Sequence, residues 1–260
     1  MSTGVERESE RDFVQSLERG LAVLQVFSRE RPSVTISEAA TSAGLTRATA
    51  RRILFTLERL GYVRTEDRRF LPTPRVLAIG YAYLSSIDLW HAVHPFLAEL
   101  ADLSQESCSA AMLDGTEVVY VARVASPRVM GVNLSVGARV PAYATSMGRV
   151  LLAGLSPGEL DHYFASVRLL PLTPRTVTGQ AELREIIRQV EEQGWCVVDQ
   201  ELEDGLCSIA APIRDRNGRV LAALTICSHA GRVTADQLRD DYLSPLLTAA
   251  KQITDQVERR

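Results

Sequence analysis

The sequence lacks the patterns that mark membrane, secreted and zinc-binding proteins. No stretch of its 260 residues approaches the roughly 18 apolar residues that a membrane-spanning helix needs. The N-terminal segment MSTGVERESERDF is too charged for a secretory signal. The cysteines are widely spaced and form no C-x-x-C pair, so they indicate neither a zinc knuckle nor a disulfide framework. We therefore expect a cytoplasmic protein, with no membrane partner, whose cysteines are small buried hydrophobic residues.

Catalytic and cofactor motifs are missing as well. The chain has no G-x-S-x-G elbow, no H-E-x-x-H and no P-loop. His91 and His94 lie three apart in a helical segment, a spacing compatible with a metal, but no third ligand is evident. The sequence thus predicts no metal site and no cofactor. An enzyme is the alternative interpretation, and it would need Cys207 or Cys227 as nucleophile with His229 as base.

Charge is unevenly distributed along the chain. The first 72 residues carry 12 basic and 10 acidic groups, a net of +2, whereas the remainder carries 17 basic and 22 acidic groups, a net of −5. Residues 46–69 hold seven arginines against three acidic residues, a local net of +4. The length and the apolar content of 46% favour two domains. The basic segment suits a polyanionic partner.

The segment from 13 to about 45 predicts two helices. Over residues 13–29 one helical face carries the large apolar side chains, which are Leu17, Leu21, Leu24 and Phe27. The run TISE at 35–38 has the capping-box pattern, so a second, short helix extends to about Ala43. Gly44 then suits the positive φ of a tight turn.

A third helix and a hairpin complete a winged helix-turn-helix over residues 13–73. Thr46 is a good N-cap and Gly61 ends the helix, while Ile53, Leu54 and Leu57 follow one stripe with Leu60. The segment YVRTEDRRFLPT reads as two short strands around a charged turn.

This arrangement fits insertion of the third helix into the major groove of operator DNA, with phosphate contacts by the wing. Arginine can bind guanine through two hydrogen bonds. The candidate DNA contacts are Thr46, Arg47, Thr49, Arg51, Arg52, Arg64, Arg68 and Arg69. The alternative is a small helical dimerisation domain whose arginines only solvate a face, but arginines in the hairpin serve no obvious purpose in a dimer seam.

The segment after the wing predicts a linker helix over residues 74–89. Residues 75–107 are mostly compatible with helix and are interrupted near Pro95. From Arg75 to about Asp88 the apolar side chains on or near one face are Val76, Ile79, Tyr83 and Ile87. We expect this face to form part of a dimer contact; the alternative is that it packs on its own wing.

Residues 90–260 predict a mixed helix and sheet domain with antiparallel pairing, a shape suited to holding a ligand. Hairpins are expected with turns at Asp114–Gly115 and at Asn217–Gly218. Two helices lie between them, one capped by Ser156 and one capped by Thr178 or a neighbour. The fold class is therefore α+β, with a winged helix-turn-helix joined by a helix to an α/β domain.

Two C-terminal stretches, RVPAYATSMGRVLLAGLS and EDGLCSIAAPIRDRNGRVLAALTICSHAGRV, together with the winged helix, resemble the IclR family of bacterial transcriptional regulators. The stretch GVNLSVGARVPAYATSMGRVLLA looks most like the PcaR/PcaU/PobR branch, which regulates aromatic-acid catabolism through the β-ketoadipate pathway. The resemblance implies a GAF-like C-terminal domain that binds a small carboxylate effector, and assembly as a homodimer or a dimer of dimers.

The same resemblance implies the residues of an effector pocket. The family's pocket helix holds the carboxylate through backbone amides, which correspond to Ser146 and Met147 here. The other matching positions are Val129, Val132, Val140, Asp199, Leu206, Ser208, Thr225 and Cys227. Thr145 is a plausible N-cap, and the first amides of a helix lack partners and attract anions. The chain departs from the branch at Cys207, where arginine is frequent, and at Cys227, where many members have serine.

Overall fold

The computed structural model describes residues 13–28, 30–86, 89–126 and 135–258. The chain divides into two compact units, residues 1–83 and 84–260, and each unit is considered by itself. In the described residues no helix is both long and apolar enough to cross a membrane.

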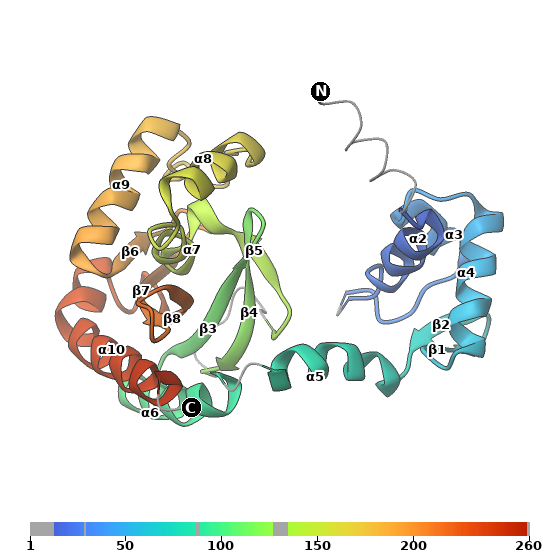
Figure 1. Cartoon of the computed structure of the whole chain (residues 1–260), viewed down its shortest axis with the longest axis horizontal. Coiled ribbons are helices and arrows are strands. Elements are labelled where there is room, and N and C mark those ends of the chain that lie inside the picture. Colours follow the sequence, from blue (N-terminus) through green and yellow to red (C-terminus); the bar gives the residue numbers. More distant parts are fainter. Residues whose placement is uncertain (1–12, 29, 87–88, 127–134, 259–260) are drawn as a thin grey trace. The chain divides into compact units, whose positions relative to one another are not determined.

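The N-terminal unit is a winged helix-turn-helix, as the sequence predicts (Figure 1). Its elements are α2 (Gln15–Leu24), α3 (Ile36–Ser42), α4 (Arg47–Arg59), β1 (Val63–Glu66) and β2 (Arg69–Pro72). β1 and β2 pair antiparallel to form the wing. Buried apolar side chains from every element, among them Val23, Leu54 and Phe70, form one core, so the hairpin is held to the helices by burial of apolar area.

Local capping fixes where these helices begin and end. Thr35 and Glu38 form the capping box at the start of α3. The Thr46 side chain accepts a hydrogen bond from the Thr49 amide at the start of α4. Gly44 and Gly61 take positive φ angles of 64° and 80°, which glycine adopts at no steric cost. The predicted caps and turns of the helix-turn-helix are therefore confirmed.

The apolar face predicted for the first helix is exposed at its N-terminal end. Leu17 and Leu21 are 61% and 48% exposed, whereas Val23 is fully buried and Val26 nearly so. α2 ends at Leu24, and only its last turn reaches the core. Within the described part of this unit, the N-terminal turns of α2 keep an apolar surface in contact with solvent.

Three helical segments follow the wing: η1 (Pro74–Val76), α5 (Leu77–Ser86) and α6 (Leu89–Ser104). The interruption predicted near Pro95 is absent, because Pro95 lies inside α6. A proline inside a helix removes one backbone hydrogen bond. Burial of Val93, Leu97 and Leu100 in the core of the C-terminal unit offsets that loss.

In the described residues of the C-terminal unit, six strands form one antiparallel sheet in the order β5-β4-β3-β8-β7-β6. The strands are β3 (Ser107–Asp114), β4 (Glu117–Val124), β5 (Arg139–Pro141), β6 (Cys196–Asp199), β7 (Leu206–Arg214) and β8 (Val220–His229). The turn between β7 and β8 contains Asn217 and Gly218 as predicted. The turn between β3 and β4 lies at Gly115–Thr116, one residue later than predicted, because Asp114 pairs with Glu117.

Helices cover both faces of this sheet (Figure 1). α6 and α10 (Ala235–Glu258) pack on one face. The other face carries η2 (Ala142–Ala144), α7 (Ser146–Leu152), α8 (Pro157–Ser166) and α9 (Gln180–Gln193). Ser156 caps α8 with a capping box, while Gly179, a neighbour of Thr178, occupies the N-cap of α9 without a side-chain bond.

A glycine lets α7 lie directly against η2. A Cβ atom added to Gly148 would come within 2.0 Å of the Ala142 carbonyl oxygen, far inside van der Waals contact. Thr145 caps α7 by accepting a hydrogen bond from the Gly148 amide at 3.0 Å. The sequence thus predicts the cap correctly, and the glycine sets how close the helix comes to the preceding turn.

Candidate functional site

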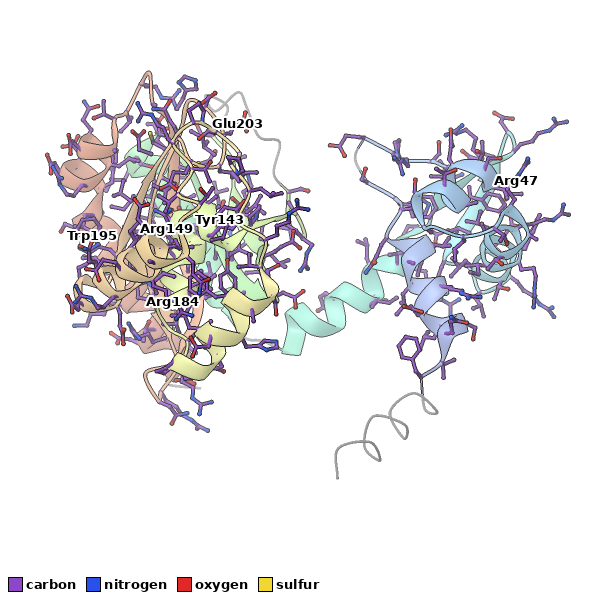
Figure 2. All side chains as sticks on the ribbon, turned by 90° about the horizontal axis from the view of Figure 1, so that it is seen from above. Arg47, Tyr143, Arg149, Arg184, Trp195 and Glu203 are labelled. Carbon is purple, nitrogen blue, oxygen red and sulfur yellow. The ribbon has the colours of Figure 1, made fainter. Side chains whose placement is uncertain are left out.

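The start of α4 carries arginines that no acidic side chain neutralises. Arg47, Arg51 and Arg52 are exposed, and Figure 2 shows Arg47 at the surface of this unit. Among the described residues, the ion pairs of the N-terminal unit involve other arginines. Arg51 lies over the Phe55 ring at 5.3 Å. The hydroxyls of Thr46 and Thr49 hydrogen bond to each other at 2.9 Å. Both threonines therefore lie at the N-terminus of α4, next to these arginines in the sequence.

Of the three arginines of the wing, one has no ion pair in the described residues. Arg68 lies at the tip, in a turn where Asp67 and Arg68 both have positive φ, and it is exposed with no ion pair in the described residues. Arg64 pairs with Glu66. Arg69 pairs with Glu38 at 2.8 Å and donates to the hydroxyl and carbonyl of Ser33. Arg69, predicted as a DNA contact, therefore ties the wing to the start of α3.

An apolar hollow of about 730 Å³ lies between α2 and α4. Its lining includes the exposed side chains of Leu17, Leu21 and Leu60, together with Ile79 from α5. Leu77 and Tyr81 of α5 are also strongly exposed. Of the predicted dimer contacts, Ile79 is 53% exposed and Val76 half-buried, whereas the side chain of Tyr83 and all of Ile87 lie outside the described residues.

In the C-terminal unit, polar side chains gather on the face of the sheet that α7 covers. Side chains alternate between faces along a strand, and the neighbours on either side of Ser109, Ser208 and Thr225 belong to the core on the opposite face. We call this set the polar patch, and it consists of Ser107, Ser109, Ser146, Ser208, Thr225 and Cys227. Ser146 on α7 hydrogen bonds to Ser208 on β7 at 2.8 Å. Thr225 donates to the Ile209 carbonyl at 2.8 Å.

The structure brings together several residues of the predicted effector site. Ser208 lies beside Cys227 in the register of β7 and β8, and Ser146 bonds to Ser208. Met147 and Val140 belong to one buried cluster. Leu206 is half-buried two residues before Ser208. These residues face the same region between α7 and the sheet.

Other predicted effector residues lie elsewhere. Asp199 pairs with Cys207 across β6 and β7, and it accepts a hydrogen bond from the Cys207 thiol at 2.7 Å. Its carboxylate therefore lies on the opposite face of the sheet from the polar patch, where it also pairs with Arg175. Val129 and Val132 lie outside the described residues.

Sequence reasoning missed Arg123 of β4. This half-buried arginine reaches across to β3, where its terminal nitrogens lie 3.5 Å from the hydroxyls of Ser109 and Ser107. It also missed Tyr120, whose side chain is 5% exposed and interacts electrostatically with Cys227 and Arg123. Burial raises the pKa of the Tyr120 hydroxyl, so the group is neutral. Tyr120 and Arg123, which interrupt the apolar run that follows Glu117 in EVVYVARV, were the available signal.

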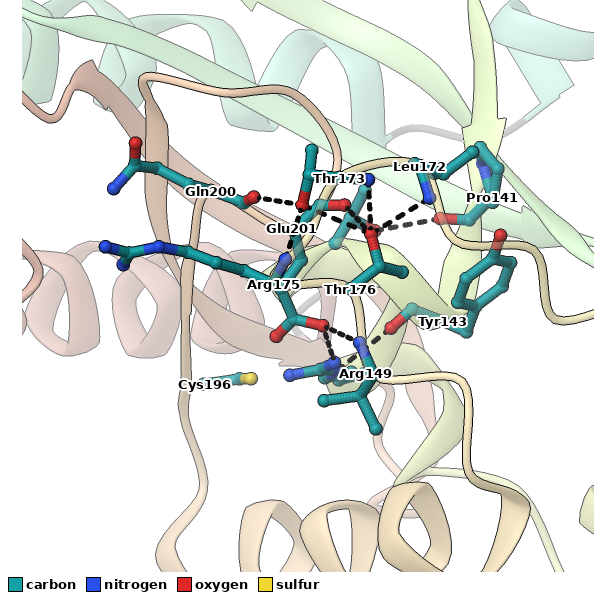
Figure 3. Close-up of polar contacts among 12 residues, drawn as sticks. Pro141, Tyr143, Arg149, Leu172, Thr173, Arg175, Thr176, Cys196, Gln200 and Glu201 are labelled. Atoms are coloured by element: carbon teal, nitrogen blue, oxygen red, sulfur yellow. Dashed lines mark hydrogen bonds and ion pairs between the residues drawn. The ribbon is translucent and has the colours of Figure 1, made fainter.

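A buried ion pair holds α7 in place (Figure 3). Arg149 of α7 and Glu201, which follows β6, are 3% and 9% exposed and lie 2.6 Å apart. Arg149 also donates to the Tyr143 carbonyl at 3.0 Å, and Glu201 accepts from the Val177 amide at 2.9 Å. Thr176 donates to the Glu201 carbonyl at 2.6 Å. The pair thus joins α7 to two segments that are distant in sequence.

The cysteines show no catalytic arrangement in the described residues. Burial raises the pKa of Cys207 and of Cys227 to about 12, so both thiols are protonated at neutral pH and are poor nucleophiles. His229, the base that the enzyme interpretation needs, accepts a hydrogen bond from the Gly231 amide and bonds to neither thiol. His94 is exposed, the side chain of His91 is outside the description, and the described residues contain no cluster suited to a metal.

Comparisons with known proteins agree with both units. The IclR helix-turn-helix domain matches residues 16–67, and the family described as bacterial transcriptional regulator IclR C-terminal matches residues 81–255. The Pca regulon regulatory protein of Pseudomonas putida is 44% identical over 247 residues, which span 95% of this chain and 85% of that protein.

Solved structures agree as well. The transcriptional regulator RHA06195 of Rhodococcus sp. RHA1 is 47% identical, with a TM-score of 0.82 over 94% of this chain and 98% of that chain. The inducer-binding domain of a double mutant of PobR from Acinetobacter, in complex with 3-hydroxybenzoic acid, is 32% identical, with a TM-score of 0.60 over 64% of this chain and 97% of that one.

Removing the cation of the buried pair should destabilise the C-terminal unit strongly. In Arg149→Leu the Glu201 carboxylate would remain buried without its cation, which costs about 3–5 kcal/mol of unfolding free energy. The matched control is Arg188→Leu, which breaks the exposed pairs with Glu185 and Glu192 and should barely move the melting temperature. Thermal unfolding followed by circular dichroism measures both. Equal melting temperatures for the two variants would contradict the proposed importance of the buried pair.

Proposed function

Because the chain belongs to the IclR family of bacterial transcriptional regulators, in the branch of the Pca and PobR regulators, we propose that it controls genes of aromatic-acid breakdown in response to a small organic acid. It is a DNA-binding regulator and not an enzyme. The arginines without acidic partners on α4 are the observation that carries the DNA-binding role. Such a protein acts where the chromosome lies, in the cytoplasm.

The reading surface consists of α4 and the tip of the wing. Arg47 and Arg51 are four residues apart and share one side of the helix, so both can reach base edges in the major groove. Arg52 lines the hollow beside α2 and lies nearer the edge of this surface. Thr46 and Thr49 at the helix start can bind phosphate. Arg68 at the wing tip supplies a phosphate contact, and Arg64, which is paired with Glu66, supplies a weaker one.

A second copy of the chain covers the apolar hollow between α2 and α4. One winged helix has too small a footprint for strong specific binding, so two copies on a roughly palindromic site are needed. The exposed leucines of α2 and Ile79 of α5 provide apolar area that favours burial against another copy. Dimers of this kind can pair further into tetramers.

The effector binds between α7 and the sheet, against the polar patch. Its apolar part packs on Val140, Met147 and Leu206, and its oxygen atoms meet the hydroxyls of Ser146 and Ser208 and the first amides of α7. Thr225 and Cys227 form the floor. Binding changes affinity for the operator only if the acid favours one arrangement of the two reading heads over another.

Arginine truncations on α4 should weaken operator binding and relax its sequence preference. Arg47→Ala or Arg51→Ala should reduce the free energy of binding to an operator selected from random DNA by about 1–3 kcal/mol. Arg68→Ala should weaken binding to all DNA sequences alike. It should also reduce the slope of log affinity against log salt concentration by about one. Fluorescence anisotropy at several salt concentrations measures each, with Arg188→Ala as control. Normal operator affinity in an Arg47→Ala, Arg51→Ala double variant would refute this docking geometry.

Charge placed on the apolar hollow should dissociate the dimer. Leu17→Glu or Leu21→Glu would bury a carboxylate in the interface, so light scattering should detect monomers at micromolar concentration and operator affinity should fall through lost avidity. Leu247→Glu, an exposed leucine of α10, is the matched control. A wild-type protein that is monomeric with and without DNA would show the proposal to be wrong.

Removing the first amide of α7 should abolish the response to the effector. Ser146→Pro is compatible with the fold, because proline is favoured at the first helical position and Thr145, at φ −128° and ψ 146°, has the extended conformation allowed before it. Ser146→Ala keeps the amide and removes only the hydroxyl, so it should weaken the response less than Ser146→Pro does. Calorimetry with protocatechuate, 4-hydroxybenzoate and β-ketoadipate tests the class. Tight binding of an uncharged or cationic compound, with no heat from any acid, would contradict it.

A further inference from the structure

Arg123 is a half-buried cation without a carboxylate partner in the described residues. It lies on the face of the sheet that α7 covers, and its terminal nitrogens donate to the hydroxyls of Ser109 and Ser107 at 3.5 Å, the outer limit for a hydrogen bond. Both serines are fully buried. The donors of the guanidinium are therefore largely unused.

The acidic group next to this serine pair is already neutralised. Glu106 directly precedes Ser107 and is 2% exposed, and both of its carboxylate oxygens accept hydrogen bonds from Arg232. Buried cations are normally paired. A guanidinium that lies over two buried hydroxyls, with no carboxylate partner among the described residues, is suited to an anion from outside the chain.

The polar patch has a second end on β7. In the strand order β3-β8-β7, Ser107 pairs with Cys227 and Cys227 pairs with Ser208. Ser208 therefore lies two strand spacings, or about 10 Å, from the serines that Arg123 contacts. There the Ser146 hydroxyl donates to Ser208, which leaves the Ser208 hydroxyl free to donate to a further oxygen atom and the Ser146 oxygen free to accept from a hydroxyl.

From these two ends we infer that the effector is a two-ended acid: its carboxylate pairs with Arg123, and a second oxygen-bearing group, at its far end, bonds to Ser146 and Ser208. Thr225 and Cys227 lie beneath the middle of the molecule. The inference rests on the proposed effector site and states which end of that site is charged. Dicarboxylates and hydroxy-substituted aromatic acids share this chemistry.

Two variants test the two ends of the proposed effector site independently, Arg123→Gln for the carboxylate and Ser208→Ala for the second oxygen group. We would titrate the full-length protein by calorimetry with two matched pairs of acids, adipate against hexanoate and 4-hydroxybenzoate against benzoate. Arg123→Gln should weaken both members of a pair by about tenfold or more, since a charge-assisted hydrogen bond is lost from each. Ser208→Ala should weaken only the member that carries the second oxygen group. Arg139→Gln, an exposed arginine of β5 paired with Asp114 and Glu117, is the control and should bind like wild type.

Each outcome has a defined meaning. The pair that shows the larger preference for its two-ended member tells whether the second group is a carboxylate or a phenol hydroxyl. Wild-type affinity in Arg123→Gln, or equal weakening of benzoate and 4-hydroxybenzoate by Ser208→Ala, would overturn the inference while leaving the effector proposal intact. Acids that neither bind the wild-type protein nor change its operator affinity would instead refute the proposed function. Melting temperatures confirm that each variant is folded.

Discussion

The position of α7 depends on the ion pair between Arg149 and Glu201. Taking two charges out of water costs several kcal/mol for each ion, and the cost is recovered only when the remaining donors and acceptors are also satisfied. Here the Tyr143 carbonyl and the Val177 amide satisfy them. The pair therefore requires η2, the 173–177 segment and the end of β6 to be in place together. By holding α7 against the sheet, it supports the contact of Ser146 with Ser208, the one place where α7 joins the polar patch.

The use of arginine differs between the parts of the reading unit. Arg64 and Arg69 bind acidic side chains of the same unit and so stabilise the wing, whereas the arginines of α4 and the wing tip have no such partner in the described residues. An arginine in an internal pair would have to lose that pair before it could bind DNA. Composition alone counts these residues equally, and only the three-dimensional contacts separate structural arginines from those available to a polyanion.

The parts that sequence predicts well are those determined within a few residues. The caps formed by Thr35, Thr46, Thr145 and Ser156 follow from local hydrogen bonds, and the family resemblance supplied the fold. Three results depended on distant contacts. Arg69 is bound by Glu38, 31 residues earlier in the chain. Leu17 stays exposed because only the last turn of α2 meets the core. Asp199 lies on the face of the sheet opposite the polar patch because the register of β6 and β7 places it beside Cys207. Arg123 was missed because its partners are on another strand.

The pairing of β3 with β8 has a consequence for how the chain folds during synthesis. Ser107 meets Cys227 across this junction, so the central strands of the sheet cannot join until nearly the whole polypeptide has left the ribosome. Closing so long a loop is also entropically costly, which slows folding. The helices and wing of the N-terminal unit are complete by Pro72, and their shared core closes within that segment. The N-terminal unit can therefore fold while the sheet is still being translated, and a nascent chain exposes unpaired strand edges for longest in the C-terminal unit.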